Sequence, residues 1–378
     1  YWLLLKDTTR NEVNIHAFYD DGAYFFDATR GLGEPVDSLD LGNEINLVIH
    51  DWGSAMGFQY ARENPSRIKS ISFMEAIVMP MTWDDWPEIA RNIFQLMRSE
   101  AGEEIVKHPS IPIITFTGSV KTGKRIAMHA AKNLKKISLE LGGKDPVIIC
   151  DDADIDVAAK GTSWGGFVNS GQVCTSIERV YVFSNVADRF TESLVEESKK
   201  VKLGDPMDAD TDLGPMASKA QLKNTVEKVA LAKNQGARIL TGGHRPKEFA
   251  RGYFFSPTIF DRVRPDMEIV TEESFSPLIP VQKVDSLDEA IKMSNATKYG
   301  LGCTIFTRDI ERAMNAADKI KSGTVCINSP LMENIAAPFG GMKQSGIGRE
   351  HGIDALDEFR EAKHIYIDYE HSKKNWWF

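Results

Sequence analysis

The sequence predicts an α/β fold in which a mostly parallel sheet carries helices on both faces. Between residues 146 and 328, short apolar runs typical of buried strands alternate with longer runs that have helical spacing. Parallel neighbours need such long crossover connections, so the alternation favours a parallel sheet over an antiparallel one. The 42% hydrophobic and 26% charged composition is ordinary for a globular protein, and 378 residues suffice for two or three domains.

The first hundred residues divide into two parts. Residues 1–43 mix charges, glycines and aromatics without sustained periodicity, and predict no strong element. Residues 45–50 read as a buried strand, 51–54 as a tight turn, 55–64 as a helix and 67–73 as a second strand. This order predicts a strand–turn–helix–strand unit with the polar residue Asp51 at its elbow.

The next predicted unit contains a candidate phosphate-binding turn. Residues 111–116 read as a strand, and Gly118, Ser119 and Gly123 open a helix that runs to about residue 131. Glycine lets the backbone approach a phosphate closely, and a helix N-terminus favours an anion. An ordinary strand-to-helix turn explains the same residues, so both interpretations stay open. Residues 136–141 read as the following strand.

Later elements follow from the same periodicities. Acidic residues 151–154 are typical of a helix start, and residues 338–350 are glycine-rich and predict a loop. Residues 364–369 alternate apolar and polar side chains, which predicts an edge strand. We predict helices at 154–168, 186–202, 218–235, 286–296 and 310–321, and strands at 146–150, 179–183, 304–306 and 324–328.

Two stretches carry residues suited to covalent catalysis. Cys174 follows a glycine-containing turn at Gly171, and Glu140 ends an apolar run just before two glycines. A thiolate is a strong nucleophile, and a carboxylate can deprotonate water, so together they suit acyl chemistry. Taken singly, the thiol could be inert core and the carboxylate a solvated surface group.

Charge and cysteine usage exclude several classes. A net charge of −9 provides no basic field for nucleic acid or an anionic membrane. The four cysteines are widely spaced and the eight histidines show no metal-ligand spacing, which indicates free thiols, no metal site and a reducing compartment such as the cytoplasm. No apolar run approaches the ~20 residues of a membrane span.

From about residue 105 to the end, the chain resembles the aldehyde dehydrogenase family. The run from Leu139 to Lys144, followed by Gly171 to Cys174, carries the resemblance. It implies that Cys174 is the nucleophile, Glu140 the general base, and NAD or NADP the cofactor. It further implies an aldehyde oxidised to a carboxylic acid through a cysteine thiohemiacetal and thioester, and a homo-oligomeric assembly.

The resemblance also implies roles for further residues. Gly118, Ser119 and Gly123 would face the cofactor pyrophosphate, and the backbone of Leu141 would meet the nicotinamide carboxamide. Glu273 would hold the nicotinamide ribose and Phe275 would pack beside the ring, although without this context a surface acid and a core aromatic are the preferred interpretation. Asn328 and Phe339 would line the substrate pocket. The family usually has glycine where this chain has Ser276, which puts the shape of that loop in question.

Residues from about 20 to 104 are similar to a different family, the haloalkane dehalogenases and coelenterazine luciferases among the α/β-hydrolases. The stretch from His50 to Gly57 looks like their nucleophile elbow, which implies Asp51 as nucleophile, Trp52 as a halide contact and Glu75 as the partner of a histidine. The histidine and the cap domain of that family do not follow, so we expect no hydrolase activity and interpret the chain as a chimera.

These interpretations predict four domains: 1–104 a hydrolase-like fragment, 105–141 the second-half remnant of a dinucleotide-binding domain, 142–345 the catalytic domain, and 346–378 a C-terminal helix with an oligomerisation strand. Residues 1–104 lack the Pro-Trp-Asn segment and the ribose-binding Lys and Glu of the family, so we expect impaired activity. A catalytically inactive fusion or binding protein is the alternative. The aldehyde, the choice between NAD and NADP and the number of subunits stay open.

Overall fold

The computed structural model describes residues 2–7, 12–17, 45–50, 66, 68–74, 100–249 and 251–369, with side chains from residue 102 onward. The chain divides into two compact units, Tyr1–Gly102 and Glu103–Phe378. In the part of the chain that is described, no helix has the length and apolar content needed to cross a membrane. Each unit is treated by itself below.

The first unit contains a four-stranded sheet in chain order. Its strands are β1 (Trp2–Asp7), β2 (Glu12–Ala17), β3 (Ile45–His50) and β4 (Ile68–Met74). β1 and β2 are antiparallel, whereas β3 is parallel to both β2 and β4. The strands predicted at 45–50 and 67–73 are therefore confirmed. The prediction of no element in residues 1–43 is wrong, because a strand is stabilised by its cross-strand partner, which single-segment periodicity does not detect.

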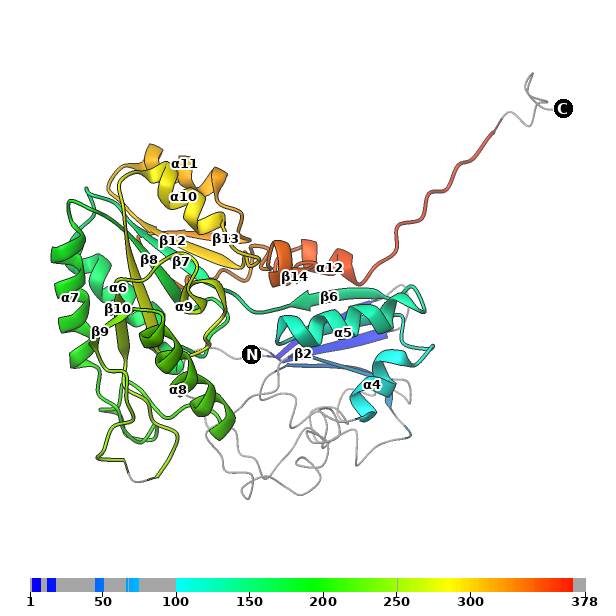
Figure 1. Ribbon diagram of the computed structural model, residues 1–378. Coiled ribbons are helices and arrows are strands. Elements are labelled where there is room, and N and C mark those ends of the chain that lie inside the picture. The colour runs from blue at the N-terminus through cyan, green and yellow to red at the C-terminus, as the bar shows by residue number, and fades with distance from the viewer. Residues whose placement is uncertain are drawn as a thin grey trace. The chain divides into compact units, whose positions relative to one another are not determined.

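The second unit is organised around a seven-stranded sheet (Figure 1). All neighbouring pairs are parallel except the edge pair β9–β10. The predicted α/β class with a mostly parallel sheet is thereby confirmed. In spatial order the strands are β13 (Thr324–Ile327), β12 (Gly302–Phe306), β7 (Asp145–Ile149), β8 (Ile177–Phe183), β11 (Leu278–Val284), β10 (Thr258–Asp261) and β9 (Arg238–Thr241).

Both faces of this sheet are buried. Along β7, Val147 and Ile149 belong to one core cluster, whereas Ile148 belongs to another on the opposite face. This alternation is the period-two geometry of a strand, and it explains why the sequence of β7 is continuously apolar. The covering helices are α6 (Ile155–Phe167) and α7 (Ala187–Lys200) on one face, and α10 (Leu287–Asn295) and α11 (Ile310–Lys319) on the other; α8 (Lys219–Asn234) and α9 (Glu268–Thr271) enclose a third cluster.

A smaller three-stranded sheet has the order β14–β6–β5. It combines β5 (Ile113–Thr117), β6 (Lys136–Glu140) and the short β14 (Gly346–Ile347). Helix α5 (Val120–Ala131) packs on this sheet through Ile126 and Ala130, and α4 (Glu100–Lys107) precedes it. The predicted loop at 338–350 therefore contains a strand, because Gly346 pairs with Glu140 across more than two hundred residues.

After the short helix α12 (Asp354–Glu358), the described chain forms no further helix or strand as far as Tyr369 (Figure 1). The edge strand predicted at 364–369 is therefore absent from this chain. Ile365 and Tyr366 are 71% and 79% exposed. A strand needs a hydrogen-bonding neighbour, and the alternating pattern by itself does not provide one.

Candidate active site

The turn before Cys174 is an unusual backbone structure. Asn169, Ser170 and Gly171 follow α6 with φ of 52°, 59° and 68°, all in the left-handed region. The hydroxyl of Ser170 donates to the carbonyl of Gly214 at 2.8 Å, and Gly171 lies so close to the carbonyl of Ser276 that a Cβ would overlap it. This turn places Cys174, which is partly exposed, just before the start of β8.

Glu140 ends β6 and is buried, with 4% of its surface exposed. Neither carboxylate oxygen has a hydrogen-bond partner of good geometry among the described residues. Burial raises the pKa of Glu140 to about 8, with further raising by Glu350 and Glu333 and a partial opposing effect of Arg349. A buried carboxyl group without a side-chain hydrogen-bond partner is typical of a functional site.

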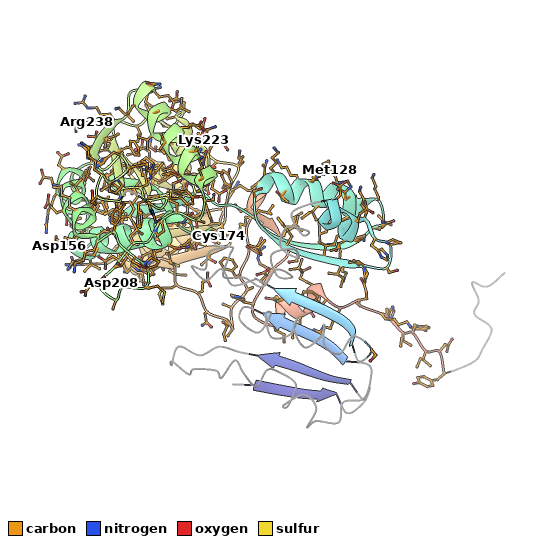
Figure 2. The ribbon with its side chains drawn as sticks, turned by 90° about the horizontal axis from the view of Figure 1, so that it is seen from below. Met128, Asp156, Cys174, Asp208, Lys223 and Arg238 are labelled. Atoms are coloured by element: carbon orange, nitrogen blue, oxygen red, sulfur yellow. The ribbon has the colours of Figure 1, made fainter. Side chains whose placement is uncertain are left out.

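The structure brings the Glu140 and Cys174 segments together. Gly143, three residues beyond Glu140, packs so tightly on the carbonyl oxygen of Cys174 that a Cβ there would overlap it. Burial raises the pKa of the Cys174 thiol to about 12, and the charges of Asp145 and Glu140 add to this effect. Cys174 lies on the body built around the seven-stranded sheet (Figure 2). The thiol is therefore protonated at neutral pH in this arrangement.

A small cavity of about 20 Å³ adjoins Cys174 on the side of Thr175. Asp145, Glu333 and Phe339 are among its lining residues. Asp145 is 4% exposed, and burial raises its pKa to about 7. Phe339 and Thr175 thus line the same cavity, and a role of Phe339 in a substrate pocket stays a prediction.

Asn328, by contrast, lies at a different cavity. Its side chain makes two hydrogen bonds with the backbone of Thr307, each of 2.9 Å, and its own φ is 59°. The cavity it lines has a volume of about 320 Å³ and also includes Asp154 and Ile310. The structure therefore separates Asn328 from Phe339, although the sequence interpretation grouped them in one pocket.

The residues expected to face the pyrophosphate form one connected group. Ser119 caps α5 by accepting from the amide of Thr122 at 3.3 Å. The amide of Gly118 donates to the carbonyl of Glu140 at 2.9 Å. A Cβ on Gly123 would lie 2.5 Å from the side chain of Leu141, so α5 approaches β6 as closely as glycine allows.

The residues expected at the nicotinamide ribose lie beside the two glycines that follow Leu141. One oxygen of Glu273 accepts a hydrogen bond from the amide of Gly143 at 3.1 Å, and a Cβ on Gly142 would overlap the same carboxyl group. Burial raises the pKa of Glu273 to about 7, and Glu178 adds to the rise. Phe275 is 36% exposed and has a φ of 48°.

Ser276 stands where the family usually has glycine, and its backbone conformation does not require glycine. Its φ is not positive; the left-handed residue of this loop is Phe275. The loop therefore needs no glycine at position 276, and the Ser276 hydroxyl is free to bond with Thr225 at 2.7 Å.

The sequence interpretation missed several residues around the site. Lys144 and Glu178 form a buried ion pair with an N–O distance of 2.6 Å. Ser345 accepts the amide of Leu141 through its carbonyl, and its hydroxyl donates to the carbonyl of Gly142. Glu178 could have been found from the sequence, because it is a charged residue within a continuous strand run and a buried charge needs a partner.

The chain was compared with known families and proteins. A model of the aldehyde dehydrogenase family matches residues 68–365. The chain belongs to the aldehyde dehydrogenase family. This match begins at Ile68, within the segment expected to resemble hydrolases, and nothing found supports the hydrolase resemblance or a chimera. Asp51 and Glu75, on which that resemblance depended, lie outside the described residues.

Related family members are well represented among bacterial enzymes. A betaine aldehyde dehydrogenase of Brucella anthropi is 42% identical over 271 residues, which is 71% of this chain and 56% of that protein. One of Rhizobium johnstonii is 36% identical over 319 residues, or 83% and 63% of the two chains. The chain thus spans about three fifths of the length of these relatives.

Solved structures of this family superpose on the chain. The betaine aldehyde dehydrogenase of Staphylococcus aureus in complex with NAD+ is 34% identical, with a TM-score of 0.74 over 88% of this chain and 68% of that one. An aldehyde dehydrogenase of Bacillus cereus is 35% identical, with a TM-score of 0.73 over 85% of this chain and 62% of that one. The fold is therefore that of aldehyde dehydrogenases.

Proposed function

We propose that this protein oxidises an aldehyde to a carboxylic acid with NAD or NADP, and that Cys174 and Glu140 perform the covalent chemistry. The observation that carries the proposal is the contact between the two loops, where Gly143 packs on the Cys174 backbone and the buried carboxyl group of Glu140 has no side-chain hydrogen-bond partner among the described residues. Family membership supports this assignment.

The thiol of Cys174 attacks the aldehyde carbon and forms a thiohemiacetal. Because burial raises the pKa of this thiol to about 12, its proton must leave as the carbon–sulfur bond forms, and it ends on the former carbonyl oxygen as the carbon–oxygen double bond becomes single. After oxidation the acyl group is a thioester on Cys174. Glu140 then takes a proton from the water that attacks the thioester, and its pKa of about 8 is close to the pH at which such a base works well.

The residues present fit a dinucleotide. A Cβ on Gly118 would lie 2.5 Å from the ring of Phe116, so glycine gives a close backbone approach at this turn, and the turn opens directly into the N-terminus of α5. Gly118 and Ser119 would hold the pyrophosphate, whereas Leu141, Glu273 and Phe275 would hold the nicotinamide end. When bound, the cofactor supplies a hydride acceptor. Nothing in the described residues favours NAD over NADP.

For the substrate, we propose an aldehyde that carries a quaternary ammonium group. The relatives named above are betaine aldehyde dehydrogenases. The cavity beside Thr175 has a volume of about 20 Å³, room for about one water molecule, so the relatives alone support this substrate class. The test compares kcat/KM for betaine aldehyde with kcat/KM for neutral aliphatic and aromatic aldehydes; equal values would remove the preference.

The function itself is tested by replacing the thiol. Cys174→Ala should abolish reduction of NAD in the presence of aldehyde, because no thiohemiacetal forms. Cys150→Ala is the control, since Cys150 is a free thiol in a core cluster that lines neither cavity described above, and it should leave the rate within about twofold of the parent. Aldehyde-dependent NADH formation that survives in Cys174→Ala would disprove the assignment. Weak turnover by the parent would bear out the impairment predicted from the sequence.

A dehalogenase activity through Asp51 has no supporting observation in the comparisons. It would require an alkyl group bound covalently to Asp51 after exposure to a reactive haloalkane. Peptide mass spectrometry detects such an adduct directly, and its absence removes this alternative.

A further inference from the structure

The loop from Glu273 to Ser276 has a backbone shape that its own residues do not favour. Phe275 adopts a φ of 48°, in a region that is sparsely populated by aromatic residues. The loop lies between α9 and β11 and carries Glu273, whose carboxyl group reaches the amide of Gly143. Contacts from outside the loop must therefore hold it in place.

One set of contacts comes from β8. Glu178 accepts hydrogen bonds from the amides of Ser274 and Phe275, both of 2.7 Å, with one carboxylate oxygen for each. Its charge is paired with Lys144, and the two side chains are only 3% and 0% exposed. Lys144 also donates to the Ser274 hydroxyl at 3.1 Å. A carboxylate is the one side chain that can accept both amides and neutralise the lysine at once.

A second set comes from α8 and contacts the carbonyl side of the same loop. The side-chain amide of Gln221 donates to the carbonyls of Ser274 at 3.0 Å and Phe275 at 2.6 Å. The Ser276 hydroxyl lies 2.7 Å from the Thr225 hydroxyl and also bonds to the carbonyl of Ser274. The amides and the carbonyls of Ser274 and Phe275 are thereby bonded to side chains from β8 and α8.

We propose that Glu178 and Ser276 are positioning residues that fix the left-handed turn at Phe275 and so hold Glu273 in the geometry for binding the cofactor ribose. This inference rests on the proposed function for its cofactor part. The contacts bind backbone polar atoms of a loop and add little apolar packing, which favours positioning over core stability. The carbonyl of Ser276 also lies close against Gly171, so the same loop contacts the turn that precedes Cys174.

The test compares Ser276→Ala with Ser294→Ala. Both serines are buried, at 1% and 4% exposure, but the Ser294 hydroxyl has no hydrogen-bond partner among the described residues. Amide hydrogen exchange of residues 273–276 should become about tenfold faster in Ser276→Ala and stay unchanged in Ser294→Ala. Affinity for NAD, measured by calorimetry, should fall about fivefold in Ser276→Ala alone, because the ribose segment is no longer preorganised.

Glu178→Gln is the stronger variant. Glutamine keeps the shape but can accept only one of the two amides and cannot neutralise Lys144. If this variant folds, exchange at Ser274 and Phe275 should increase more than in Ser276→Ala. If this variant does not fold, the comparison of Ser276→Ala with Ser294→Ala still tests whether side-chain contacts hold the loop.

The results distinguish the role of Ser276 in the loop, its effect on cofactor binding and the proposed function. Equal exchange in the two serine variants overturns the role of Ser276. Faster exchange with unchanged NAD affinity overturns the cofactor part and leaves a structural contact only. Failure of the unaltered chain to bind NAD overturns the proposed function, and the exchange data then still show whether the two residues fix the loop.

Discussion

Cys174 and Glu140 illustrate how environment determines chemistry at the scale of single residues. Burial raises the pKa of the Cys174 thiol to about 12, and the charges of Asp145 and Glu140 add to this effect. Burial also raises the pKa of Glu140 to about 8, so the fraction of Glu140 that can accept a proton increases as the pH rises through about 8. The same environment therefore makes the thiol a weaker acid and the carboxylate a stronger base.

At this scale we predict that Glu333→Gln makes Cys174 more reactive. Glu333 raises the pKa of Cys174, so removal of its charge should lower that pKa and increase the rate of alkylation by iodoacetamide roughly two- to threefold. Glu192→Gln, on the exposed surface of α7, is the control and should not change the rate. The rate constant is measured by mass spectrometry of the Cys174 peptide. A slower rate in Glu333→Gln would contradict the electrostatic explanation.

At the scale of elements, the close approach of α5 to β6 shapes the candidate cofactor site. Gly123 is buried in α5 against the side chain of Leu141, whose amide is held by the carbonyl of Ser345. The pairing of Gly346 with Glu140 then secures the end of β6 from the other edge. Two segments, α5 and residues 345–346, thus determine where Glu140 and Leu141 lie.

We predict that Gly123→Ala destabilises the protein although alanine favours helices. A methyl group at this position would meet Leu141 at 2.5 Å, and overpacking of this kind costs about 1–3 kcal/mol, against a gain of roughly 1 kcal/mol in helix propensity. The midpoint of urea denaturation should fall. Lys121→Ala, at an exposed position of the same helix, should leave the midpoint nearly unchanged. Equal midpoints for the two variants would refute the close packing.

At the scale of the whole molecule, buried carboxyl groups gather around the candidate site. Burial raises the pKa of Glu140 to about 8, and the pKa values of Asp145 and Glu273 to about 7. Between the unfolded values near 4 and these folded values, the folded protein binds more protons than the unfolded chain. Their contribution to stability is therefore greatest at low pH and is lost as the pH rises through about 7 to 8.

We accordingly predict that Glu140→Gln flattens the pH dependence of stability. Glutamine cannot ionise, so the decline in the free energy of unfolding between pH 6 and pH 9 should be smaller than in the parent protein. Urea denaturation at several pH values measures both curves. Glu192→Gln should follow the parent curve. A steeper decline in Glu140→Gln than in the parent would contradict the raised pKa of Glu140.

Much of the architecture follows from local pattern, because strand and helix periods are properties of a continuous segment. The helices and strands predicted between residues 146 and 328 all occur, with ends displaced by one or two residues. Strands β9 and β10 at the antiparallel edge, and the seven-residue β11 inside the sheet, were not predicted. β9 and β10 have only four residues each, and their stability comes from neighbours rather than from a long periodic run.

The α/β class, the acidic start of α6 at Asp154 and the two motifs that contain Glu140 and Cys174 follow from the amino-acid sequence alone. Only the tertiary structure decided that Gly143 packs on the Cys174 backbone, that Gly346 pairs with Glu140, and that Asn328 and Phe339 line different cavities. It also decided that the loop carrying Phe275 is held by Glu178 and Ser276. Periodicity reports what each segment buries, whereas contacts between distant segments depend on the packing of the whole unit.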